Sequence, residues 1–129
     1  MSTTKLAVKS GRNAMRDTYK LGELSNAGQP WSNSTGTFRG EQVTRHNRIT
    51  FGQMPADERA ELSAHIARGA CDYAIFSYET PIAYRVRSDD SAPFWVVTDT
   101  RYSNTTSQQV GKLWVLTQER CGYTGPSPV

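Results

Sequence analysis

One segment in the middle of the chain has the hydrophobic and polar spacing of an amphipathic helix. Leu62 and Ile66 are four residues apart, so they share one helix face, and the charged residues around them face water. Pro55 suits a first helical turn, and Gly69 can adopt the left-handed conformation that often ends a helix. The pattern therefore predicts a helix over residues 55–68.

Three strand-like segments follow this helix. Residues 72–78, 82–87 and 94–98 are rich in aromatic and β-branched side chains, which favour strands. The connections between them are short, so antiparallel hairpins are the most economical links. Beyond them, an apolar stripe over residues 110–117 predicts a second helix that starts after residue 104.

The first 52 residues carry a weaker pattern. Glycine, serine, asparagine and threonine dominate residues 25–40, which is typical of loops, and Trp31 and Phe38 are expected to anchor this loop against the core. Residues 41–51 fit one strand or an irregular segment equally well. We therefore expect an irregular polar N-terminal region with one short helix near residues 12–20.

These elements together predict the fold class. We expect a single small α+β domain over residues 1–129, in which two helices pack on one face of a three-stranded antiparallel sheet. The α-β-β-β-α core occupies residues 53–122. The irregular basic region occupies residues 1–52, and residues 123–129 form a loose tail.

Composition favours the cytoplasm of the cell that makes the protein as its place of action. No segment has the length and apolarity of a membrane span, and the apolar run Leu6-Ala7-Val8 is too short for a signal-peptide core. In that compartment Cys71 and Cys121 are expected to be reduced thiols. We expect no membrane contact.

Positive charge is concentrated in the first part of the chain. Residues 1–52 hold eight basic groups against three acids, whereas residues 53–129 hold seven against nine. A basic region can face an anionic partner, although spread charges are also typical of a solvated surface. Nucleic-acid binding is therefore one alternative function, and its candidate residues are Arg12, Arg16, Lys20, Arg39, Arg45 and Arg48.

The residues that could support catalysis do not assemble in sequence. His46, His65 and the two cysteines lack the spacing of metal ligands, so no metal site is expected. Ser77 and Ser103 lack the flanking glycines of a nucleophile elbow. We expect neither a cofactor nor an enzymatic activity.

A cluster of polar residues forms the most promising binding site. It surrounds the junction between the last strand and the last helix, where an anion or a polar ligand such as a nucleotide could be held. The same residues could instead serve as a capping and turn network. The cluster comprises Tyr78, Thr80, Asp99, Arg101, Tyr102, Ser103, Thr105, Thr106 and Gln109.

The same part of the chain carries a family resemblance. The hairpin sequence Ser77-Tyr-Glu-Thr-Pro-Ile-Ala83 and the motif Tyr102-Ser-Asn-Thr-Thr-Ser107 resemble short proteins of unknown function encoded by bacteriophages of actinobacteria. In that pattern a His-Gln pair usually follows, where this chain has Gln108-Gln109, which argues against a catalytic role for that position. The resemblance implies a phage origin and no known activity.

These observations lead to one functional hypothesis and two alternatives. The hypothesis is a non-catalytic phage accessory protein that binds a host or defence component in the host cytoplasm. The alternatives are nucleic-acid binding through the basic region and the binding of a small ligand, such as a nucleotide, at the polar cluster.

Overall fold

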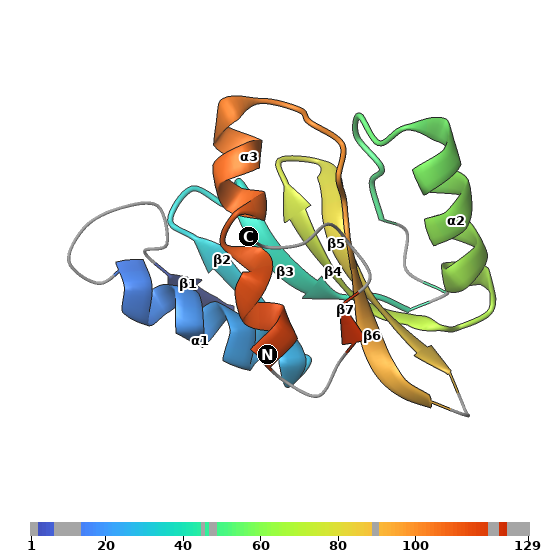
Figure 1. The fold of residues 1–129 in the computed structure, drawn as a ribbon, viewed down its shortest axis with the longest axis horizontal. Helices are drawn as coiled ribbons and strands as arrows, with labels where there is room; N and C mark the ends of the chain where they lie inside the picture. The colour runs from blue at the N-terminus through green and yellow to red at the C-terminus, as the bar shows by residue number, and fades with distance from the viewer. Residues whose placement is uncertain are drawn as a thin grey trace.

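The computed structural model describes residues 3–6, 14–44, 46, 49–88, 91–118 and 122–123, which form one mixed sheet with helices on both sides (Figure 1). The strands lie in sequence order across the sheet and are β1 (Thr4–Leu6), β2 (Trp31–Asn33), β3 (Phe38–Gln42), β4 (Cys71–Ser77), β5 (Thr80–Ser88), β6 (Ser91–Val97) and β7 (Gly122–Tyr123). The helices are α1 (Ala14–Asn26), α2 (Ala56–Ala67), α3 (Asn104–Val110) and the 3-10 helix η1 (Leu113–Gln118).

The expected three-stranded antiparallel sheet is wrong, although the class is α+β. The three predicted strands correspond to β4, β5 and β6, which pair antiparallel as expected. On one side β3 pairs antiparallel with β4, and β2 and β1 extend the sheet through a segment that we expected to be irregular. On the other side β7 pairs parallel with β6. These added strands are short and polar, so backbone pairing rather than an apolar pattern includes them in the sheet.

The helices cover opposite faces of the sheet, which corrects the expectation of two helices on one face. Leu62 of α2 belongs to one buried cluster with Ala74 and Phe76 of β4. Tyr73 and Ile75, the alternate residues of the same strand, belong to a second cluster with residues of α1 and η1. Figure 1 accordingly shows α2 apart from α1 and η1. A strand buried on both faces reads as a continuous apolar run, as residues 73–76 of β4 do, but such a run does not say which helix covers which face.

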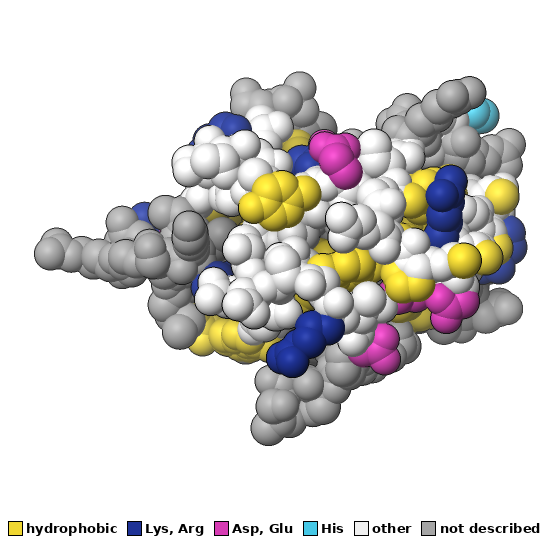
Figure 2. All heavy atoms as spheres, turned by 90° about the horizontal axis from the view of Figure 1, so that it is seen from above, with side chains coloured by type: hydrophobic (Ala, Val, Ile, Leu, Met, Phe, Trp, Pro, Cys, Tyr) yellow, Lys and Arg dark blue, Asp and Glu magenta, His cyan; other side chains and the backbone are white. Residues whose placement is uncertain are grey.

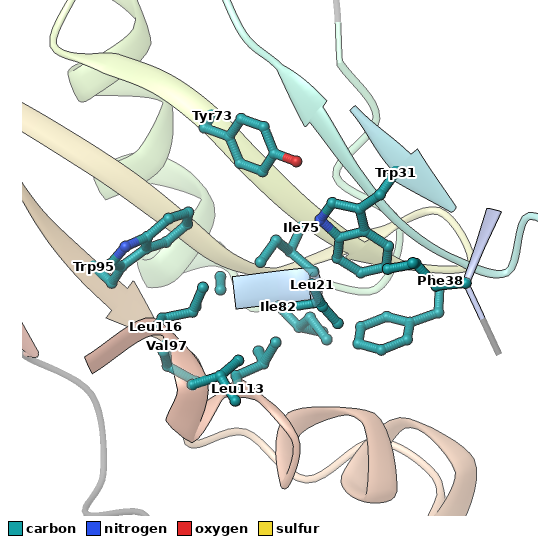
Figure 3. Packing of buried hydrophobic residues seen from close by; sticks show 13 residues of the cluster. Leu21, Trp31, Phe38, Tyr73, Ile75, Ile82, Trp95, Val97, Leu113 and Leu116 are labelled. Carbon is teal, nitrogen blue, oxygen red and sulfur yellow. The ribbon is translucent and has the colours of Figure 1, made fainter. Parts of the chain in front are cut away.

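The larger of the two clusters is built around aromatic residues, among them Trp31, Phe38, Tyr73 and Trp95 (Figure 3). Trp31 donates to Ser25 Oγ at 2.8 Å, and its ring lies edge-on to Phe38 at 4.9 Å between centroids. Tyr73 donates to the Gln29 carbonyl at 2.6 Å. Trp31 and Phe38 therefore anchor the segment 25–40 against the core, as expected.

A buried ion pair ties the end of α1 to the centre of the sheet. Arg85 binds Asp72 through two contacts, Nε to Oδ1 at 2.9 Å and Nη2 to Oδ2 at 3.1 Å. Its Nη1 donates to the Asn26 carbonyl at 2.8 Å, at the carboxyl end of α1. Trp95 donates to the side chain of the same Asn26 at 2.9 Å. Arg85 is buried, so these contacts compensate for its lost hydration.

Two sequence features concern membranes and thiols. None of the helices in the described ranges has the length and apolarity needed to cross a membrane. Cys71 is a buried free thiol at the start of β4. Of the expected loose tail 123–129, Tyr123 instead belongs to β7, and residues 124–129 lie outside the described residues, as do Cys121 and residues 7–13.

Candidate functional site

The turn between β4 and β5 holds an aromatic residue in an unfavourable backbone conformation. Ser77 and Thr80 are paired, so Tyr78 and Glu79 form a two-residue turn. Tyr78 has φ +55°, and no other non-glycine residue in the described part of the chain has a positive φ. A positive φ at the first turn position favours glycine, and a side chain there costs about 1–2 kcal/mol. Yet the Tyr78 side chain is 51% exposed, so it adds little to the core.

Neighbouring groups hold this turn in place. The Tyr78 amide donates to the Thr37 carbonyl at 2.7 Å, and Arg39 Nη1 donates to the Tyr78 carbonyl at 2.5 Å. The guanidinium of Arg39 also lies over the Phe76 ring, 4.6 Å from its centroid. A strained residue persists only where its surroundings determine its conformation, and β3 supplies that restraint here.

The segment before α2 lies against the same turn. Thr50 Oγ1 donates to the Glu79 carbonyl at 2.7 Å, and the Gln53 amide donates to Thr80 Oγ1 at 2.9 Å. Between them, Gly52 has φ +51°, and a Cβ there would lie 2.2 Å from Thr80 Oγ1. Only glycine allows this close approach of two backbone segments.

A chain of three hydroxyl groups joins the turn to the start of α3. Ser103 caps the helix, because its Oγ accepts from the Thr106 amide at 3.1 Å. The Ser103 hydroxyl donates to Thr106 Oγ1 at 3.1 Å, and Thr106 Oγ1 lies 2.8 Å from Ser77 Oγ. The pairing of a β4 residue with an α3 residue fixes the last helix over the turn.

These three segments enclose a pocket of about 430 Å³, within the usual range for small-molecule sites. Figure 2 shows the molecule from above, the side on which the β4–β5 turn lies in Figure 1, and uncharged surface predominates around its centre. Glu79 is the one residue with a formal charge among the lining residues, which are Gly52, Gln53, Ser77, Tyr78, Glu79, Thr80, Tyr102, Ser103 and Thr106. We call this the hairpin pocket.

Tyr102 forms part of the inner wall of the hairpin pocket. Its side chain packs against the larger core cluster. Burial, and to a lesser extent the carboxylate of Glu58, raise the pKa of Tyr102. Thr98 Oγ1 donates to that carboxylate at 2.8 Å, and Thr100 Oγ1 donates to it as well. Tyr102 therefore stays protonated at neutral pH.

The structure brings together five of the nine residues of the predicted polar cluster. Tyr78, Thr80, Tyr102, Ser103 and Thr106 line the hairpin pocket. The remaining four are not among its lining residues: Asp99, Arg101 and Thr105 are exposed, and Gln109 is buried.

Sequence reasoning missed four residues of the hairpin pocket. Ser77 and Glu79 lie inside the hairpin motif, so the motif itself was the signal that could have found them. Gly52 and Gln53 carry no such signal, because only folding brings them to the turn. Gln109 lies outside the pocket lining, and its Oε1 is buried without a hydrogen-bond partner among the described residues.

The candidate nucleic-acid residues do not form an unpaired basic surface where the structure describes them. Arg16 lies 3.3 Å from Asp17, and Lys20 lies 3.3 Å from Glu23. Arg39 pairs with Glu41 at 3.2 Å and supports the turn. The other three, Arg12, Arg45 and Arg48, lie outside the described residues.

Comparison with known proteins identifies a family. The model of a family of unknown function (DUF8033) matches residues 28–119, a range that includes every residue of the hairpin pocket. No curated protein and no solved structure matches the chain.

Proposed function

The chain belongs to the family of unknown function DUF8033, and we propose that it is a non-catalytic binding protein whose ligand enters the hairpin pocket. The observation that carries this proposal is Tyr78, a half-exposed aromatic residue in a conformation that favours glycine, at the edge of a pocket.

The energetic balance at Tyr78 favours a role in recognition. The backbone strain lowers stability, and the half-exposed ring recovers only part of that cost through burial. Glycine would remove the strain. Exposed aromatic rings beside pockets commonly contribute to binding, because they bury a large area at low entropic cost. A ligand that covers the ring would account for a tyrosine at this position.

The chemistry of the pocket favours binding over catalysis. Thr106 is hydrogen-bonded to both Ser77 and Ser103, and the described lining residues include no histidine, cysteine or lysine. A serine nucleophile needs a base held beside it, and these hydroxyl groups face other hydroxyl groups instead.

The test is a comparison of matched tyrosine variants. Ligand-observed NMR with a library of neutral, anionic and cationic small molecules should identify compounds that bind the wild-type chain saturably. Tyr78→Ala should weaken their binding at least tenfold. Tyr19→Ala is the control, because Tyr19 is 50% exposed and lies on α1. The proposal fails if no compound binds, or if both variants bind as the wild type does.

The biological setting that we propose is that of a phage accessory protein in the host cytoplasm, with a host or defence component as its partner. The resemblance of the hairpin and Tyr-Ser-Asn-Thr-Thr-Ser motifs to phage proteins supports this setting, and those motifs supply most of the hairpin pocket. A photo-crosslinking residue at position 78 should capture a host component that the same residue at position 19 does not. Identical capture at both positions would contradict the proposal.

A further inference from the structure

We infer that the ligand of the hairpin pocket is an uncharged ring that carries adjacent hydroxyl groups, such as a sugar or the ribose of a nucleoside. This inference rests on the proposed function and specifies its ligand class. Three features of the pocket support it: its charge, its hydroxyl groups and the position of the Tyr78 ring.

The charge of the pocket disfavours anionic ligands. Among the described residues that line the pocket, Glu79 is the one with a formal charge, and none of them is a lysine, an arginine or a histidine. The nearest described arginine on the β3 side, Arg39, is occupied by the Tyr78 carbonyl, Glu41 and the Phe76 ring. A phosphate in the pocket would therefore lie near the negative charge of Glu79, with no compensating cation among the described lining residues. This is the reason that the ligand is a neutral molecule and not a nucleotide.

The hydroxyl chain can still form hydrogen bonds with a ligand. Ser77, Ser103 and Thr106 have three hydroxyl protons, and two hydroxyl–hydroxyl contacts join them. One proton is therefore left for donation, and a hydroxyl oxygen has two lone pairs to accept with. A ligand hydroxyl both donates and accepts, so it matches this chain better than a group that only accepts. Glu79 adds an ionised acceptor, which forms stronger hydrogen bonds with hydroxyl donors.

The Tyr78 ring supplies an apolar surface beside these polar groups. The ring is half exposed, whereas Ser77 and Thr106 are buried. Sugar rings have one face of C–H groups and a rim of hydroxyl groups, and nucleosides have a flat base beside the ribose. Both can lie on an aromatic ring while the hydroxyl groups reach the inner wall. The two sources share the chemistry that the pocket recognises.

The test compares neutral probes with their phosphorylated counterparts. Isothermal titration should show that glucose or uridine binds the wild-type chain, and that glucose 6-phosphate or uridine monophosphate binds about tenfold more weakly. Tetrahydropyran, which has a ring but no hydroxyl groups, should not bind. Glu79→Gln should reduce the difference between the neutral and phosphorylated probes, because it removes the repelling charge.

A matched pair on α3 tests the hydroxyl chain. Thr106→Val removes one hydroxyl at nearly constant shape and should weaken binding of the neutral probe about tenfold. Thr105→Val, at the adjacent exposed position, should leave binding unchanged. If Thr106→Val does not fold, Glu79→Gln, at an exposed position, still tests the inference through the phosphate comparison.

The outcomes separate this inference from the proposed function. If phosphorylated probes bind as tightly as neutral ones, or if only cationic or apolar compounds bind in a Tyr78-dependent way, the inference is wrong and the binding function stands. If no compound in any class binds, both are wrong. If glucose binds and uridine does not, the ligand is a sugar, and if only uridine binds, the ligand is a nucleoside.

Discussion

Backbone strain at Tyr78 predicts that glycine is more stabilising than alanine at this position, whereas the opposite is expected at the equally exposed Tyr19. Tyr78 is 51% exposed in a turn with positive φ, and Tyr19 is 50% exposed in a helix. At each position the alanine variant removes the ring, and the glycine variant then differs from it only in backbone freedom. The difference in unfolding free energy between glycine and alanine therefore isolates the backbone contribution.

The expected magnitudes follow from the conformations. At Tyr78, glycine relieves about 1–2 kcal/mol of strain that alanine retains. The greater conformational freedom that glycine gives the unfolded chain reduces this gain in unfolding free energy by about 0.4–1 kcal/mol. Tyr78→Gly should therefore be more stable than Tyr78→Ala by about 0.5–1 kcal/mol. At Tyr19, glycine in a helix should be less stable than alanine by about 1 kcal/mol.

The assay is equilibrium urea denaturation of all four variants, with m-values checked for agreement. We expect glycine to raise the midpoint relative to alanine at position 78 and to lower it at position 19. A lower midpoint for glycine at both positions would refute the strain at Tyr78, and with it the main support for the proposed binding site.

Three further predictions concern the surroundings of the pocket and the core. Gly52→Ala should destabilise the chain by about 2–4 kcal/mol in urea denaturation, because its Cβ would lie 2.2 Å from a hydroxyl of the hairpin at positive φ. Arg85→Met should lower the unfolding free energy by about 2–4 kcal/mol, since it leaves Asp72 without its bidentate partner. The control, Arg87→Met, removes a single exposed contact with Asp72 at 3.1 Å and should lower the unfolding free energy by under about 1 kcal/mol. Equal losses in the two variants would contradict this explanation. Burial raises the pKa of Cys71 from 9.0 to about 12, so in a Cys121→Ser variant the thiol should resist alkylation at pH 8 until the chain unfolds. The contribution of the protonated thiol to the unfolding free energy should be complete below pH 9.0 and should decrease between pH 9.0 and about 12. Rapid alkylation of the folded chain would contradict this prediction.

Part of the candidate site was predictable from the sequence. The sequence predicted a helix that starts after residue 104, and α3 does begin at Asn104, but its cap, Ser103, was found only in the structure. What could not be predicted is the 2.8 Å contact between Thr106 and Ser77, which are 29 residues apart. The strain at Tyr78 was equally hidden, because a Tyr-Glu turn has none of the glycine or asparagine that announces a positive φ.

Local signals in the sequence determined the elements with a strong apolar pattern. The helix expected over residues 55–68 is α2, and the aromatic and β-branched segments are β4, β5 and β6. Tertiary structure alone decided which elements join them. Strands such as β2 and β3 are held by backbone hydrogen bonds to distant residues and by buried aromatic rings, and backbone groups are the same in every sequence. The opposite placement of α2 and α1, and the meeting of Gly52 with Thr80, likewise depend on contacts between segments far apart in the chain, which no local pattern records.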